Sequence, residues 1–209
     1  MSALRPALRT SIASVALALA GAALLAGATD GFRAFTTEAA RRIAVRERPV
    51  MVPPVALETQ SGERINLAEL RGKWLLVDFV YTGCQTLCLS LGSDFTRLED
   101  ELAGPIAKGR VRLLSISFDP SNDSPRELAA YLERFHRRGA GWLAARPTSK
   151  AGLAELKQRF GITVVPDGFG GYAHNAAIHL VDPQGRIVEI VDLGERNAII
   201  ESLRRAGVT

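Results

Sequence analysis

The sequence predicts an α/β domain in which helices flank a mixed central sheet, preceded by an N-terminal hairpin. Three patterns support this. Trp74–Tyr81 is an almost continuous apolar run, which is typical of a central strand buried on both faces. From Cys84 onward, apolar residues recur at helical spacing, and Val111–Phe118 then forms a second apolar run. Asp182–Gly185 is a turn signal between two short strand-like segments and predicts an antiparallel hairpin.

The other elements follow from local signals. Val55–Leu57 and Arg64–Leu67 flank a polar stretch and predict the first hairpin, and Asn66 with Glu69 predicts a short capped turn. The later elements are a helix from Ser124 to about Arg137, a strand at Trp142–Ala145, a helix at Ser149–Phe160 ended by Gly161, strands at Ile162–Val165, Ala176–Val181 and Arg186–Val191, and a closing helix at Glu195–Arg205.

The N-terminal run Ile12–Ala28 is uncharged and mostly apolar, and it follows Arg5 and Arg9. Such a run is either a membrane anchor or a signal peptide cleaved at the small residues Ala26–Ala28. We favour the anchor and expect export of the chain that follows it.

The expected organisation has three parts. Residues 1–28 form the signal or membrane-anchor segment, 29–53 a stalk or linker, and 54–209 one folded domain. This places the domain in the cell envelope, in the periplasm or an equivalent extracytoplasmic space. Cleavage of the leader would instead leave it soluble there.

The positive charge of the chain does not indicate a nucleic-acid partner. The sequence pI is about 9.4 and the formal net charge is +4, but the excess lies within residues 1–50. Residues 51–209 carry equal numbers of basic and acidic side chains. The folded part therefore has no electrostatic basis for binding phosphates.

Cys84 and Cys88 are the only cysteines, and three residues separate them. Residues four apart share one helix face, and the first turn of a helix favours a thiolate through its unpaired N–H groups. Thiolates bind soft metals such as Cu(I) or zinc, and they are also nucleophiles. The spacing leaves three alternatives: a metal site, a reversible dithiol–disulfide couple, and a static disulfide or incidental core cysteines.

A metal site needs a third ligand. His174 follows a glycine-rich loop and precedes a predicted strand, where ligands occur, and the alternative is an exposed loop histidine. His136 is interpreted as a solvated residue of a polar helix end, and His179 as a filler within a strand. For Asp78, in the central strand, we favour a hydrogen-bonded structural role over a proton acceptor for the cysteines. Asp123 is interpreted as a turn or cap residue.

Several spaced motifs carry a family resemblance from about Pro54 to the C-terminus. They are Leu70–Trp74 (LRGKW), Phe79–Cys84 (FVYTGC) with Cys88, Ser115–Pro120 (SISFDP) with Asp123–Pro125, and His174 ahead of Leu180–Gly185 (LVDPQG). In order and spacing the chain resembles the SCO/SenC family, copper-binding proteins that help assemble the copper centre of cytochrome c oxidase.

The resemblance implies a thioredoxin-like fold with an inserted hairpin, and it suits an N-terminal membrane anchor. It implies that Cys84, Cys88 and His174 bind copper, as Cu(I) or Cu(II). Two thiolates and one imidazole form a suitable donor set for either ion.

The surroundings of these ligands depart from the family pattern. Gln85 and Thr86 stand where the family usually has Pro-Asp, and Leu89 replaces a proline. Ala173 stands where an aspartate often precedes the histidine, and His179 where an aromatic residue is frequent. Changes around metal ligands alter affinity and redox potential. A dithiol reductase role therefore stays open beside copper transfer.

We expect a copper-binding assembly factor, a metallochaperone that delivers copper to the copper centre of cytochrome c oxidase or reduces its cysteines. Its partners would be a respiratory oxidase subunit or another copper chaperone, and it would act as a monomer. The alternative is an extracytoplasmic thiol-disulfide oxidoreductase without a required metal, in which Cys84 attacks and Cys88 resolves. A third possibility is a binding module with neither metal nor catalysis.

Overall fold

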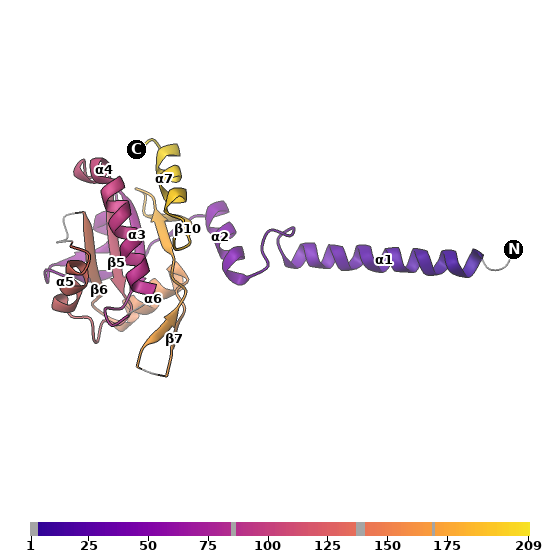
Figure 1. Ribbon diagram of the computed structural model, residues 1–209, viewed down its shortest axis with the longest axis horizontal. Coiled ribbons are helices and arrows are strands. Elements are labelled where there is room, and N and C mark those ends of the chain that lie inside the picture. Colours follow the sequence, from indigo (N-terminus) through magenta and orange to yellow (C-terminus); the bar gives the residue numbers. More distant parts are fainter. Residues whose placement is uncertain (1–3, 85–86, 137–140, 169) are drawn as a thin grey trace. The chain divides into compact units, whose positions relative to one another are not determined.

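The computed structural model describes residues 4–84, 87–136, 141–168 and 170–209 (Figure 1). The chain divides into two compact units, Met1–Glu47 and Arg48–Thr209. The first unit contains α1 (Leu4–Ala28) and α2 (Thr37–Glu47), and the second contains every described strand.

The N-terminal unit is built around an apolar helix. By length and composition, Leu8–Ala28 of α1 could cross a membrane, a test that a signal sequence also passes. The segment expected to be a stalk contains a helix, α2. Glu38 in its first turn pairs with Arg41 at 2.8 Å and with Arg42, so local ion pairs support this short polar helix.

The second unit is organised around an eight-stranded mixed sheet with the order β1-β10-β9-β4-β5-β6-β2-β3. β4, β5 and β6 are parallel, and the other neighbours are antiparallel. The predicted mixed sheet is therefore confirmed. Its strands are β1 (Val50–Met51), β2 (Ala56–Thr59), β3 (Arg64–Asn66), β4 (Trp74–Val80), β5 (Val111–Ser117), β6 (Trp142–Pro147), β9 (Ile178–Val181) and β10 (Arg186–Val191).

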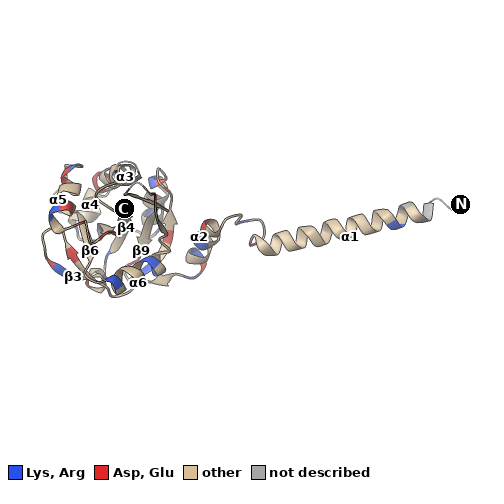
Figure 2. Ribbon diagram, turned by 90° about the horizontal axis from the view of Figure 1, so that it is seen from below, with Lys and Arg blue, Asp and Glu red and all other residues tan. Residues whose placement is uncertain are grey.

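Helices cover both faces of this sheet, as Figure 2 shows for α3 and α6. The helices are α3 (Leu87–Glu101), α4 (Ala103–Ala107), α5 (Pro125–Glu133), α6 (Lys150–Phe160) and α7 (Arg196–Arg205), with a 3-10 turn η1 (Leu67–Leu70). Leu76 and Val80 of β4 belong to one buried cluster with residues of α3, α5 and α7. On the other face of β4, the ring of Phe79 meets that of Phe160 in α6 at 5.1 Å. Burial on both faces explains the uninterrupted apolar run.

Local signals predicted several boundaries correctly. Asn66 and Glu69 form a reciprocal capping box at η1. Ser149 caps α6, and Gly161 ends it in a left-handed conformation with φ of 63°. The turn Asp182–Gly185 joins β9 to β10 as expected.

Two expectations differ from the structure. The helix expected to run to about Arg137 ends at Glu133, because Phe135 and His136 turn back on α5 and His136 takes φ of 57°; Arg137 itself lies outside the described residues. The strand expected at Ile162–Val165 does not join the main sheet. It is β7 (Val164–Pro166), which pairs with β8 (Tyr172–His174) in a separate two-stranded sheet.

Two serines at helix N-caps allow a matched stability test. The Ser149 hydroxyl accepts a hydrogen bond from the N–H of Gly152 (3.0 Å), whereas the Ser124 hydroxyl donates to the partly buried Glu127 and caps no N–H. We expect Ser149→Ala to lower the free energy of unfolding by about 1 kcal/mol, the usual cost of a lost N-cap. Ser124→Ala should cost clearly less. Urea unfolding of both variants measures this, and equal losses would contradict the assignment of the cap.

Candidate functional site

The sheet topology brings the cysteine turn and His174 to the same edge. β4 runs toward Cys84, and β9 lies antiparallel to it, with Val77 opposite His179 and Leu75 opposite Val181. The segment that precedes β9 therefore lies near the carboxyl end of β4. This is the edge where open α/β sheets place their functional sites.

Cys84 lies in a turn after β4, where its N–H donates to the carbonyl of Tyr81 (3.2 Å). We expected the helix to start at Cys84. The described helix starts at Leu87, so Cys88 lies in its first turn and Cys84 precedes it; Gln85 and Thr86 lie outside the described residues. The N–H of Cys88 donates to Sγ of Cys84 at 3.3 Å. A first-turn N–H thus points at the Cys84 sulfur, which favours a thiolate there.

His174 is buried and lies at the end of β8, rather than in the loop that its sequence context suggested. It pairs across the small sheet with Val164. Its Nε2 is 3.8 Å from Sγ of Cys88. Its Nδ1 is also buried and makes no hydrogen bond to any residue in the described part of the chain.

The distance of 3.8 Å between Cys88 Sγ and His174 Nε2 is within reach of a sulfur hydrogen bond, and it is also compatible with two ligands that share one metal ion. Metal–sulfur bonds of about 2.3 Å and metal–nitrogen bonds of about 2.0 Å place two such ligands roughly 3.5–3.8 Å apart. Within the described ranges, however, no three His, Cys, Asp or Glu side chains are gathered closely enough to hold an ion as they stand. Two of the three expected donors are together, and Cys84 is joined to them through the N–H of Cys88.

Burial keeps Cys88 and His174 neutral. Burial raises the pKa of the Cys88 thiol well above its ordinary value, with smaller contributions from Cys84 and Asp78. The expected thiolate-favouring effect of the helix start is therefore outweighed at Cys88. Burial also lowers the pKa of His174. A neutral imidazole with an available lone pair is the form that binds metals.

Asp123 holds the cysteine turn in place and is more than the cap residue we expected. Its Oδ1 accepts bonds from the N–H of Thr82 (3.1 Å) and the Thr82 hydroxyl (2.6 Å), and its Oδ2 accepts from the Ser117 hydroxyl (2.5 Å). Arg134 of the α5 C-terminal end donates to the Thr82 carbonyl at 3.1 Å. The backbone two residues before Cys84 is thus fixed from both sides. The pairing of Thr82 with a residue 41 positions away has no local sequence signal.

Asp78 lies fully buried on the central strand. Neither carboxylate oxygen makes a hydrogen bond of normal geometry to a described residue, so the favoured hydrogen-bonded structural role is not supported. Burial raises its pKa to about 7, and the neighbouring Ser115 offsets this only in part. The Ser115 hydroxyl accepts a bond from Trp142 Nε1 at 2.9 Å.

The two remaining histidines lie where we expected. His179 is fully buried, its Nε2 is 3.1 Å from the carbonyl of Phe160, and its ring packs edge-on against Phe79 and Phe160. It is a core residue on the opposite face from the cysteines. His136 is exposed at the end of α5.

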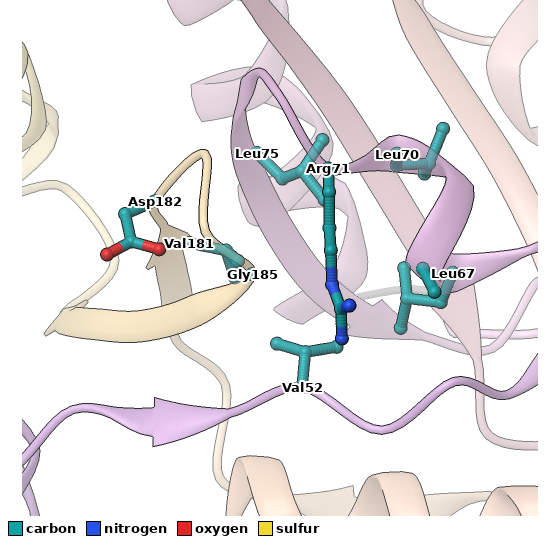
Figure 3. Close-up of a pocket in the computed structure, with 9 residues that line it drawn as sticks. Val52, Leu67, Leu70, Arg71, Leu75, Val181, Asp182 and Gly185 are labelled. Carbon is teal, nitrogen blue, oxygen red and sulfur yellow. The ribbon is translucent and has the colours of Figure 1, made fainter.

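A small pocket lies at the other end of β4. It measures about 10 Å³, room for one water molecule at most. Figure 3 shows the Arg71 side chain extending past Gly185 toward Val52. Leu75, near the start of β4, also lines it. The pocket contains neither cysteine nor histidine and is separate from the candidate site.

Comparison with known proteins places the chain in a family. A family model described as SCO1/SenC matches residues 44–206. The chain belongs to the SCO1/SenC family. The SCO1 protein homolog of Bacillus subtilis (strain 168) is 29% identical over 140 residues, which cover 66% of this chain and 72% of that relative. The resemblance carried by the sequence motifs is thereby confirmed.

Solved SCO1/SenC structures match the fold. The structure of Bradyrhizobium japonicum ScoI with copper bound is 25% identical, with a TM-score of 0.59, and covers 73% of this chain and 98% of that one. BsSco, described as having a disulfide switch and as a member of the Sco family of cytochrome c oxidase assembly proteins, is 26% identical with a TM-score of 0.65, covering 76% and 94%. The thioredoxin-like fold is confirmed by these matches.

The raised pKa of Asp78 has a consequence for stability. An unfolded aspartate ionises near pH 4, whereas the folded group holds its proton up to about pH 7. The folded state therefore binds more protons between these values, and stability should fall as pH rises from about 4 to 7, by up to about 4 kcal/mol from this group. Asp78→Asn should remove that part of the slope.

Urea unfolding across pH 4–8, followed by tryptophan fluorescence, measures this difference. Burial also raises the pKa of Asp123, but that group is present in both proteins and cancels from the comparison. The exposed Glu63→Gln serves as the control and should keep the wild-type slope. Parallel pH profiles for wild type and Asp78→Asn would contradict the assignment.

Proposed function

We propose that this chain is a copper-binding assembly factor that delivers copper to the copper centre of cytochrome c oxidase. Copper is its cargo, held by Cys84, Cys88 and His174. One observation carries the proposal: Cys88 Sγ and His174 Nε2 lie 3.8 Å apart, with Cys84 Sγ bonded to the N–H of Cys88. The copper-bound Bradyrhizobium japonicum relative and the family membership support it.

The donor set suits this cargo. Two sulfurs and one imidazole are soft and borderline ligands, which select Cu(I) and also accept Cu(II). Burial keeps His174 neutral and ready to coordinate, and it makes Cys88 release a proton when the metal enters. The bonds from Thr82 to Asp123 hold the Cys84 turn while this exchange takes place.

The proposal includes a place in the cell. α1 would anchor the chain in a membrane, with the folded unit in the periplasm or an equivalent space. The chain would act there as a monomer, and its partner would be an oxidase subunit or another copper chaperone. The apolar and exposed character of Leu8–Ala28 supports the anchor. The opposite charges that intermingle over the folded unit give no sign of a nucleic-acid partner (Figure 2).

Competition against a Cu(I)-specific chelator tests the copper site. The full chain, in detergent with reduced thiols and without oxygen, should take up one Cu(I). Cys84→Ser and Cys88→Ser should abolish uptake, because each removes a thiolate ligand. His174→Ala should weaken uptake without abolishing it, because two thiolates remain and suffice to hold Cu(I).

His136→Ala is the matched control, because it removes an exposed imidazole and should leave uptake unchanged. The proposal fails if the reduced wild-type chain takes up no Cu(I).

A thiol-disulfide oxidoreductase is the second candidate function. It is favoured by the two unbridged, adjacent thiols and by the N–H of Cys88 directed at the Cys84 sulfur. The Cys84 thiolate would attack a partner disulfide and release one partner thiol. Cys88 would then attack the mixed disulfide, releasing the second thiol and leaving a Cys84–Cys88 disulfide. The relative described as having a disulfide switch supports this alternative.

Alkylation rates assign these roles. Cys84 should react faster with iodoacetamide than Cys88, because Cys88 is fully buried and burial raises the pKa of its thiol. Cys88→Ser should therefore keep most of the fast alkylation, and Cys84→Ser should lose it. Faster modification of Cys88 would contradict the assignment of Cys84 as the attacking thiol.

A further inference from the structure

Tyr81 contacts both halves of the candidate site. Its carbonyl accepts the N–H of Cys84 at 3.2 Å, within the turn that leads to the cysteines. Its phenol oxygen accepts the N–H of Tyr172 at 3.3 Å, on the strand that ends at His174. One residue therefore bonds to the cysteine turn through its backbone and to the histidine strand through its side chain.

Ring packing reinforces this bridge. The Tyr81 ring lies 5.3 Å from the rings of both Phe118 and Tyr172, centroid to centroid. Phe118 lies 5.7 Å from Tyr172 and 5.0 Å from the imidazole of His174. Tyr81, Phe118 and Tyr172 form an aromatic cluster against which the His174 ring packs. Such contacts contribute about 0.5–1.5 kcal/mol per pair beyond burial and fix ring orientation.

Gly171 makes room for the phenol oxygen. A Cβ at this position would lie 2.9 Å from the Tyr81 oxygen and 2.6 Å from Oδ2 of Asp167. The first distance is too short for a carbon–oxygen contact, so any side chain here would displace the hydroxyl or the strand. Gly171 does not adopt positive φ, so its lack of a side chain makes room for the Tyr81 hydroxyl and the Asp167 carboxylate rather than giving backbone freedom.

The small β7–β8 sheet needs such support. A two-stranded hairpin is at best marginally stable alone. Near its base, Asn175 accepts from the N–H of Thr163 (2.7 Å) and donates to the carbonyl of Gly161 (2.9 Å). At Tyr172, the hydrogen bond to the Tyr81 phenol joins the sheet to the cysteine turn. Loss of this bond would loosen the strand that carries His174.

We propose that Tyr81 is a positioning residue that fixes the distance between His174 and the cysteines and so sets the preference of the site between Cu(II) and Cu(I). The inference rests on the proposed copper-binding function. Two thiolates alone suffice for Cu(I), whereas Cu(II) prefers three or more ligands in a tetragonal arrangement that includes nitrogen. A displaced His174 therefore weakens Cu(II) binding more than Cu(I) binding.

The test compares both copper ions on the full chain in detergent, with thiols reduced anaerobically. Cu(II) affinity is read from the thiolate-to-copper charge-transfer band, and Cu(I) affinity from chelator competition. Tyr81→Phe removes only the hydroxyl, and we expect it to weaken Cu(II) binding by about 10-fold while Cu(I) affinity stays close to wild type. Gly171→Ala keeps the hydroxyl but displaces it, and it should act in the same direction.

A core variant separates positioning from general loss of stability. Ile187→Ala creates a cavity in β10, and it should lower the melting temperature without changing the ratio of the two affinities. A similar ratio change in Ile187→Ala would overturn the inference, and so would unchanged ratios in both Tyr81→Phe and Gly171→Ala. In those cases, a wild type that binds copper leaves the proposed function standing. A wild type that binds neither ion overturns both.

Discussion

The antiparallel pairing of β9 with β4 is the constraint on which the site depends. β5 runs parallel to β4 and continues the α/β crossover, but β9 runs the other way, with Val77 opposite His179. Because of this reversal, the chain enters β9 from the same edge at which it leaves β4. Cys88 and His174 are 86 positions apart in sequence and 3.8 Å apart in space. An all-parallel sheet would have carried the segment before β9 to the opposite edge.

The features that could be predicted from the sequence are those set by residues close together along the chain. The apolar run of β4, the Asp182–Gly185 turn and the Ser149 and Gly161 caps are all local, and each is found as expected. The three metal-binding candidates could be chosen by residue type and motif resemblance. The strand placement of His174 could not, because β8 forms only by pairing with β7, a contact between short segments with weak patterns. The contact of Asp123 with Thr82 likewise depends on the packing of two loops.

Two buried carboxylates near the cysteines show how differently such groups can act. Asp123 accepts bonds from Thr82 and Ser117, which offset its burial in part and fix the turn before Cys84. Asp78 has no comparable partner in the described part of the chain, so its charged form is disfavoured. The first fixes the cysteine turn through its hydrogen bonds, and the second opposes folding once it ionises. Buried groups with strongly shifted pKa values, such as Asp78, are more frequent near functional sites than in the rest of a protein.

His174, the proposed third copper ligand, lacks within the described ranges the hydrogen bond that usually orients a metal-binding histidine. Such histidines donate their second ring nitrogen to a carboxylate or carbonyl, which fixes the ring and raises its basicity. Here Nδ1 has no such acceptor among the described residues, and the methyl side chain of Ala173 cannot supply one. Orientation is left to packing against Phe118 and to the support of the β8 strand by Tyr81. In the proposed copper site, a third ligand held by packing would be displaced at lower cost than one locked by a charged partner, which would suit the proposed release of copper to a recipient.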